Sequence, residues 1–265
     1  MTWIQVIVLA VVQGLTEFLP ISSSGHLVLV PGIFGWTDQG LVFDVAVHFG
    51  SLAAVCVYFR NDIAALLRGS LDAVAGRFEP PESRMALAIA IGTVPAAVAG
   101  LLFAGWISDN LRHPSIVVVT LAGYGILLAL ADRYGKRQRI FTDVRIHDAI
   151  VIGVAQALSL VPGTSRSGVT ISAALMLGFQ RRDAARFSFL LSAPVILLAT
   201  IYEVAMLIVE GGGVAWGTLA VAALISGVVA FASIEFFMRF VSAIGLLPFA
   251  IYRLALAGLI TVVLL

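Results

Sequence analysis

The sequence predicts an all-α integral membrane protein with an inverted-topology repeat, about six transmembrane helices and two re-entrant helical hairpins. The first observation is composition: the 265 residues are 60% hydrophobic and 12% charged, whereas soluble domains are about 25% charged. Mean hydropathy is +1.05. The second is a series of apolar segments near the ~20 residues that cross a bilayer. The third is a polar motif that occurs twice. The net charge of +1 gives no indication of a nucleic-acid partner.

The two polar motifs occupy residues 13–26 (QGLTEFLPISSSGH) and 156–168 (QALSLVPGTSRSG). They align at an offset of 143 residues, the separation of Gln13 and Gln156. Such self-similarity indicates a duplicated unit. Between the identical positions the halves diverge in chemistry. The identical pairs are Gln13 with Gln156, Leu15 with Leu158, Ser22 with Ser165, Ser24 with Ser167 and Gly25 with Gly168; among the divergent pairs are Ser23 with Arg166 and His26 with Val169.

Each motif interrupts a pair of short apolar segments. Segments 3–19 and 24–34 flank the first motif, and Pro20 ends the first of them. Segments 147–161 and 167–179 flank the second. Neither pair forms two full spans, so each is expected to be a re-entrant hairpin, which is tolerated at membrane depth only where protein or a cavity surrounds the loop.

The remaining apolar segments are long enough to cross the membrane. We expect part of the connection 60–84 to be an interfacial amphipathic helix. No linker divides the chain, so we expect one domain over 1–265, with repeat halves at about 1–131 and 132–265. The expected spans are 41–59, 85–107, 114–131, 187–208, 215–237 and 249–265.

The distribution of basic residues predicts the orientation. Connections 60–84, 132–145 and 180–186 hold twelve of the sixteen Lys and Arg residues, and such loops are normally cytoplasmic. The first hairpin then opens to the outer face and the second to the cytoplasmic face. Spans 41–59 and 187–208 run in opposite directions. In inverted repeats of this kind the broken helices meet near the midplane, where the functional site lies.

Three ionisable residues in the motifs are functional candidates because charge is costly inside a membrane. Arg166 carries a planar fork suited to phosphate oxygens. Glu17 and His26 lie in the first motif. Hydroxyl residues precede the second helix of each hairpin, and a helix start of this kind can bind an anion. These hydroxyl residues are Ser22, Ser23, Ser24, Thr164, Ser165 and Ser167.

The first motif adds groups that could perform chemistry. Ser23 with His26 and Glu17 could form an activated nucleophile, although direct attack by water with His26 as base is an alternative. Glu17 could also hold Mg²⁺ or Ca²⁺. Structural interpretations remain open: the serines could only cap helices, Glu17 and Arg166 could be an ion pair between the repeats, and His26 could be a buried donor.

Four polar residues elsewhere in the spans are open to interpretation. Asp44 and His48 lie one turn apart near the expected outer mouth, and either a direct role or local hydrogen bonding is possible. Glu203 and Arg253 are near helix ends, where snorkelling to the interface explains them as well as function does.

The motifs at 13–26 and 162–168, together with 177–189 (LGFQRRDAARFSF) and 249–253 (FAIYR), resemble those of the undecaprenyl-diphosphate phosphatases, the bacitracin-resistance family. The resemblance covers essentially the whole chain. It implies hydrolysis of undecaprenyl diphosphate to undecaprenyl phosphate and inorganic phosphate, which recycles the lipid carrier of peptidoglycan synthesis. It also implies a divalent cation, and a place in the bacterial inner membrane with the active site open to the periplasmic face.

The resemblance assigns roles by position. Ser23 is the implied nucleophile, His26 the catalytic imidazole and Arg166 the diphosphate-binding arginine, while the acidic motif falls on Gln13 and Glu17. Position 13 is glutamate in some members, so Glu17 would hold the metal alone or with substrate oxygens. The implied substrate-binding residues are Gln13, Ser22, Ser24, Gly163, Thr164, Ser165 and Ser167.

A second function is compatible with the same sequence. Inverted repeats with broken helices are a transporter architecture, so the anion site could carry a lipid phosphate between leaflets. The cluster of Ser23, His26 and Glu17 in one repeat favours catalysis. No oligomeric state follows from the sequence.

Overall fold

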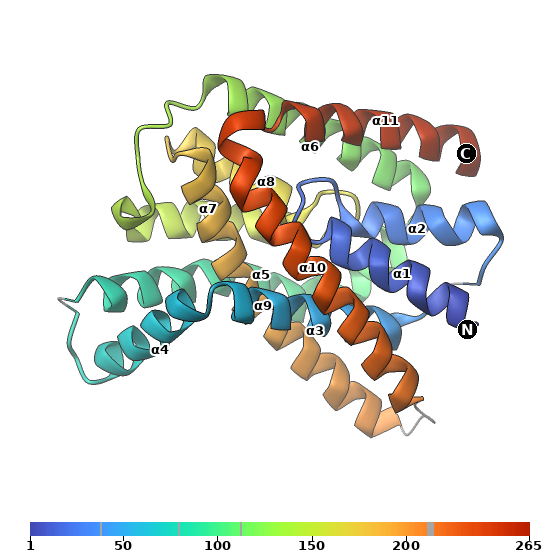
Figure 1. Cartoon of the computed structure of the whole chain (residues 1–265), viewed down its shortest axis with the longest axis horizontal. Coiled ribbons are helices and arrows are strands. Elements are labelled where there is room, and N and C mark those ends of the chain that lie inside the picture. Colours follow the sequence, from blue (N-terminus) through green and yellow to red (C-terminus); the bar gives the residue numbers. More distant parts are fainter. Residues whose placement is uncertain (38, 79, 112, 211–214) are drawn as a thin grey trace.

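The computed structural model describes residues 1–37, 39–78, 80–111, 113–210 and 215–265, which form eleven α-helices and one short 3₁₀ helix (Figure 1). Their bounds are α1 Trp3–Thr16, α2 Ser23–Phe34, α3 Leu41–Tyr58, α4 Arg60–Val74, α5 Pro81–Asn110, α6 Pro114–Tyr134, η1 Phe141–Asp143, α7 Ile146–Leu158, α8 Arg166–Met176, α9 Arg181–Glu210, α10 Trp216–Ile244 and α11 Leu247–Leu264.

The helical class and the spans agree with the prediction. In the described residues, α5, α6, α9, α10 and α11 are each long and apolar enough to cross a membrane. Counted together, α3 and α4, which meet at a bend of 87°, give a sixth candidate span by length and composition. Helix α4 takes up much of the connection 60–84 and packs against α5. Large apolar side chains on the spans face outward, as a lipid-facing surface requires; Leu101, Leu224 and Val262 are examples.

The two hairpins are built alike. Helices α1 and α2 surround the first break, and α7 and α8 surround the second. Ser22 and Ser165 each adopt a left-handed backbone conformation, with φ of 72° and 68°. Each hydroxyl then accepts a hydrogen bond from the backbone N–H three residues later, on Gly25 and Gly168 respectively. This shared cap starts α2 and α8 one residue earlier than expected from sequence.

The halves pack on each other in an exchanged pattern, in which each hairpin packs on helices of the other half of the chain. Helix α1 packs on α10 of the other half, and its counterpart α7 packs on α5. Likewise α2 contacts α11, whereas α8 contacts α6. Figure 1 shows the consequence: the α1–α2 and α7–α8 connections, blue and yellow, lie together near the middle of the molecule. The repeat therefore brings the two polar motifs to one place.

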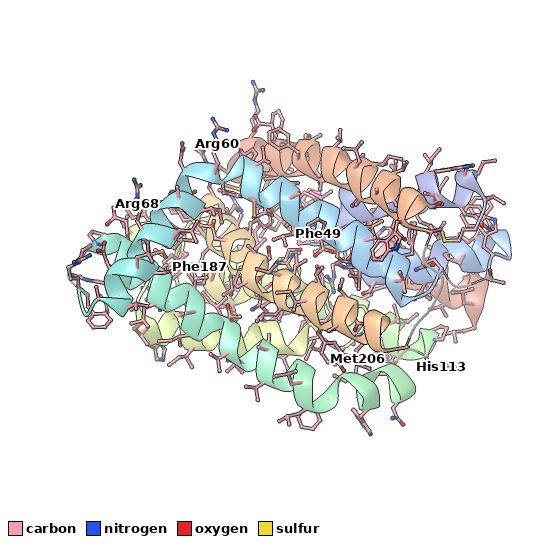
Figure 2. The ribbon with its side chains drawn as sticks, turned by 90° about the horizontal axis from the view of Figure 1, so that it is seen from below. Phe49, Arg60, Arg68, His113, Phe187 and Met206 are labelled. Atoms are coloured by element: carbon pink, nitrogen blue, oxygen red, sulfur yellow. The ribbon has the colours of Figure 1, made fainter. Side chains whose placement is uncertain are left out.

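Ion pairs join the basic connections at one end of the molecule. Figure 2 shows Arg60 and Arg68 at this end and His113 and Met206 at the opposite end. Arg186 pairs with Asp62, which links connections that are far apart in sequence. Two further pairs are Arg181 Nε with Asp132 Oδ1 at 2.6 Å and Arg139 Nη1 with Asp148 Oδ1 at 2.9 Å. The hydrogen bond to Asp148 raises the pKa of the Arg139 guanidinium.

Candidate active site

An ion pair between the two hairpins forms the centre of the site. Arg166 Nη2 donates to Glu17 Oε1 at 2.9 Å. The Glu17 residue is only 7% exposed, so water screens this pair little. Two further hydrogen bonds cross between the hairpins: the Ser167 hydroxyl donates to the Leu19 carbonyl at 3.1 Å, and the Gly163 N–H donates to Ser24 Oγ at 3.1 Å. The predicted meeting of the broken helices is present.

The other oxygen of Glu17 faces three polar groups. Ser23 Oγ and Gln13 Nε2 each donate to Oε2 at 2.9 Å. His48 Nε2 lies 3.5 Å from the same oxygen. The carboxylate is therefore flanked by Arg166 and an imidazole, with the Ser23 hydroxyl hydrogen directed at it. A carboxylate in this position can take a proton from the serine.

The remaining hydroxyl residues line the starts of α2 and α8. Ser22 Oγ and Ser24 Oγ are 3.1 Å apart, and Ser165 Oγ and Ser167 Oγ are 3.3 Å apart. Ser22 and Ser165 serve as caps, so the structural interpretation accounts for their hydroxyls. Thr164 Oγ1 is buried and has no hydrogen-bond partner in the described part of the chain.

His26 lies away from the carboxylate of Glu17. Its Nδ1 is 2.8 Å from the Ser22 carbonyl oxygen. Since a carbonyl only accepts, Nδ1 carries the hydrogen, and Nε2 accepts from the Tyr252 hydroxyl at 2.7 Å. The two rings stack with an interplanar angle of 8°. The imidazole thus supports the Ser22 turn that positions Ser23.

The expectation that Arg253 could snorkel to the membrane interface is wrong. Its exposure is 0%, because its guanidinium lies beneath both breaks instead of at the interface. Gly168 and Gly125 leave room for it, since a Cβ at either position would come within 3.1 Å and 3.2 Å of Arg253 atoms respectively. The acceptors of its hydrogen bonds are the backbone carbonyls of Pro20, Thr120, Leu121, Gly163 and Thr164.

A cavity of about 620 Å³ opens beside the ion pair. Its polar lining includes Ser23, Glu17, His48 and Arg166, and also Asp44 and Glu203. Helices α2 and α9 also contribute apolar lining residues, which are Leu27, Val28, Pro31, Val195, Ile196 and Ala199. The lining therefore offers both polar and apolar contacts to a ligand. His26 is not among the lining residues.

The side chains of the site offer too few ligands to hold a divalent cation by themselves, so a bound substrate would have to supply further oxygen ligands. Among the described residues, no three His, Cys, Asp or Glu side chains cluster to hold a metal ion. Gln13 Oε1, however, is buried without a hydrogen-bond partner in the described chain, next to the Glu17 carboxylate. Mg²⁺ typically takes one or two carboxylates and completes its shell with phosphate oxygens and water. The two oxygen donors match the ligand chemistry of such a cation; Gln13 is 0% exposed and does not line the cavity.

Some site residues could not be identified from the motifs. The proximity of His48 to Glu17 and of Tyr252 to His26 depends on how α3 and α11 pack. Ionisable groups are costly in apolar spans, so His48 and Arg253 could be recognised from the sequence as candidates. The sequence did not indicate which residues they contact.

The fold and site define a multi-pass α-helical membrane protein with a polar pocket where two broken helices of an inverted repeat meet. Residues 6–259 match the family described as "Bacitracin resistance protein BacA", and the chain belongs to this family. It is 51% identical to the undecaprenyl-diphosphatase of Hahella chejuensis over 98% of each chain. It is 50% identical to that of Nitrosococcus oceani over 98% of each, and 51% identical to that of Chromohalobacter salexigens over 97% of each.

Proposed function

We propose that this protein hydrolyses undecaprenyl diphosphate to undecaprenyl phosphate and inorganic phosphate. Full-length relatives at about half identity carry the name undecaprenyl-diphosphatase. The cavity supports the same substrate class, because its lining combines polar residues such as Ser23 and Arg166, which suit a diphosphate, with apolar residues of α2 and α9, which suit a prenyl chain.

The observation that carries the proposal is the hydrogen bond from Ser23 Oγ to Glu17 Oε2 at 2.9 Å. This contact presents a hydroxyl nucleophile to its base, while Arg166 holds the second carboxylate oxygen. If the Glu17–Arg166 ion pair were purely structural, it would not need the hydrogen bond from Ser23.

The reaction then follows in two steps. Ser23 Oγ attacks the terminal phosphorus, its proton passes to Glu17, and the bond from that phosphorus to the bridging oxygen breaks to release undecaprenyl phosphate. Water next attacks the phosphoserine, its P–Oγ bond breaks, and a proton returns to the serine as inorganic phosphate leaves. Phosphoryl transfer depends mostly on positioning and charge neutralisation. The Arg166 guanidinium and the starts of α2 and α8 would provide both.

We include a divalent cation, Mg²⁺ or Ca²⁺, in this proposal. Glu17 and the free amide oxygen of Gln13 would hold it, and a bound cation would supply further neutralisation of phosphate charge. His26 would act on Ser23 indirectly by holding the Ser22 turn.

The proposal includes location and physiology. We place the protein in the bacterial inner membrane, with the cavity open to the periplasmic side. This orientation is supported by the ion-paired basic end opposite His113 and Met206, because basic ends are normally cytoplasmic. Recycling of the peptidoglycan lipid carrier and bacitracin resistance would follow from the activity.

Vesicles reconstituted with the purified full chain test the proposal. With undecaprenyl diphosphate in the membrane, we expect one inorganic phosphate per undecaprenyl phosphate formed. The inverted repeat makes a lipid carrier the second candidate. Movement of a labelled prenyl phosphate between leaflets without phosphate release would favour the carrier and contradict the phosphatase.

A further inference from the structure

A tyrosine outside both breaks contacts the half of the site that carries the proposed nucleophile. Tyr252 lies on α11, in the segment 249–253. Its hydroxyl is 2.7 Å from His26 Nε2, and the two rings stack with their centroids 5.6 Å apart. Because His26 is only 8% exposed, the Tyr252 hydroxyl supplies the hydrogen bond that this buried nitrogen needs.

The contact holds in either charge state of the imidazole. Nδ1 of His26 carries a hydrogen in both states, because its neighbour at 2.8 Å is the Ser22 carbonyl oxygen, which only accepts. A hydroxyl can donate or accept, so Tyr252 donates to Nε2 when the ring is neutral and accepts from Nε2 when the ring is charged. One ring nitrogen is thus tied to α11 while the other holds the Ser22 carbonyl.

The Ser22 carbonyl belongs to the peptide group that joins Ser22 to Ser23. Ser22 has a φ of 72°, a left-handed conformation that non-glycine residues adopt rarely and at a cost. Ser23 follows directly, and its Oγ donates to Glu17 Oε2 at 2.9 Å. Rotation of this peptide group would move the backbone of Ser23 and redirect its hydroxyl. His26 opposes such a rotation because it holds the carbonyl oxygen.

The second break shows that the capping turn forms without an imidazole. Ser165 has a φ of 68° and caps α8 through its hydroxyl. The residue aligned with His26 is Val169, and the Ser165 carbonyl accepts from its backbone N–H at 2.9 Å. The imidazole and Tyr252 are therefore additions to a turn that does not require them, and they occur in the half that carries Ser23.

We propose that Tyr252 is a positioning residue for the reaction. Through His26 it fixes the peptide group before Ser23, and so keeps the hydroxyl directed at Glu17 when the diphosphate is bound. This role rests on the proposed function, since it concerns the nucleophile of that reaction. It deepens that function because it assigns part of the positioning to α11, which contacts α2 from the other half of the chain.

The experiment measures kcat and KM for undecaprenyl diphosphate with purified wild type, Tyr252→Phe, His26→Phe and the double variant. Tyr252→Phe removes one hydroxyl and keeps the stacked ring, whereas His26→Phe keeps a ring and removes both hydrogen bonds. Tyr202→Phe is the matched control, because Tyr202 is exposed on α9 and does not line the cavity. Amide hydrogen exchange of the segment 20–27, measured by mass spectrometry, reports on the first break without turnover.

For Tyr252→Phe we expect kcat to fall about three- to ten-fold, the size of one lost hydrogen bond. KM should stay within about two-fold of wild type, because the phosphate-binding guanidinium of Arg166 is untouched. Exchange in the segment 20–27 should become faster. In the His26→Phe background the same substitution should have no further effect on kcat, because the two side chains act as a unit. Tyr202→Phe should match wild type in every readout.

A role confined to folding predicts a different result. Faster exchange in Tyr252→Phe with an unchanged kcat overturns the inference, as does a rise in KM in place of the fall in kcat. A fall in kcat that adds to that of His26→Phe overturns it too, and so do unchanged exchange and kcat. If Tyr252→Phe loosens the break but the wild type releases no phosphate from the lipid, the proposed function fails and the contact between α11 and the break stands.

Discussion

Arg166 Nη2 lies 2.9 Å from Glu17 Oε1, although the two residues are 149 positions apart in the chain. The contact exists because each residue occupies the break of one hairpin, and the exchanged packing of the halves brings the breaks together. The ion pair is buried and is flanked by Ser23 and His48.

Replacement of Arg166 by alanine should reduce phosphate release by at least about 100-fold, the typical effect of removing a donor that stabilises developing charge. Arg166→Lys should recover little, because an ammonium lacks the planar fork. Phosphate-release assays on purified protein check this, with Arg133→Ala as control since Arg133 is exposed at the end of α6. Activity within two-fold of wild type in Arg166→Ala contradicts a role for the guanidinium.

Loss of the Arg253 guanidinium should destabilise both hairpins. Arg253→Leu leaves buried carbonyl groups without donors, each of which costs about 1–3 kcal/mol, so we expect a clear fall in Tm in detergent. The exposed Arg239 on α10 provides a control, Arg239→Leu, with little change expected. Equal Tm values for the two variants would show that the carbonyl contacts of Arg253 contribute nothing to stability.

Gly163 should tolerate no side chain. Its φ is +87°, and a Cβ would lie 2.2 Å from Thr120 Oγ1 and 2.7 Å from the Val117 carbonyl oxygen. Gly163→Ala should therefore lower stability by at least about 1–3 kcal/mol and move the carbonyls held by Arg253. Gly123→Ala, on α6 where a Cβ meets open space, should be neutral or slightly stabilising. Thermal unfolding of both variants distinguishes the positions, and a neutral Gly163→Ala contradicts the tight packing of this break.

Chelation should abolish phosphate release if a divalent cation joins the diphosphate at Glu17. Excess EDTA followed by added Mg²⁺ or Ca²⁺ should show loss and then recovery of activity, measured with metal-free substrate. Full activity in EDTA would remove the cation from the proposal and leave neutralisation to Arg166 and the helix starts.

The breaks in the hairpins were the part of the fold most accessible from sequence. Pro20 ends the first apolar segment, and the serines that follow have short side chains that cap a new helix. The same chemistry recurs around Pro162 and Ser165, so local physics and the internal repeat gave the same answer twice. The helix boundaries differ by a few residues, as with α8, which ends at Met176 where segment 167–179 was expected.

Long-range contacts were not accessible in the same way. Arg253 is one arginine in an apolar stretch, and its local sequence does not distinguish a snorkelling side chain from one that turns inward. The carbonyl groups that accept hydrogen bonds from its guanidinium belong to both breaks and to α6. These carbonyl groups come close to one another only when the two halves pack together. The same applies to His48, whose contact with Glu17 depends on the position of α3 relative to the first break.

Ser23 provides the most direct test of the account, because its hydroxyl is the proposed nucleophile and donates to Glu17 at 2.9 Å. The measurement is the rate of inorganic phosphate release from undecaprenyl diphosphate by purified Ser23→Ala, beside Ser70→Ala on the exposed part of α4. We predict a loss of at least about 1,000-fold for Ser23→Ala, with an unchanged Tm and wild-type activity for Ser70→Ala. A folded Ser23→Ala protein that releases phosphate within ten-fold of the wild-type rate would contradict the account.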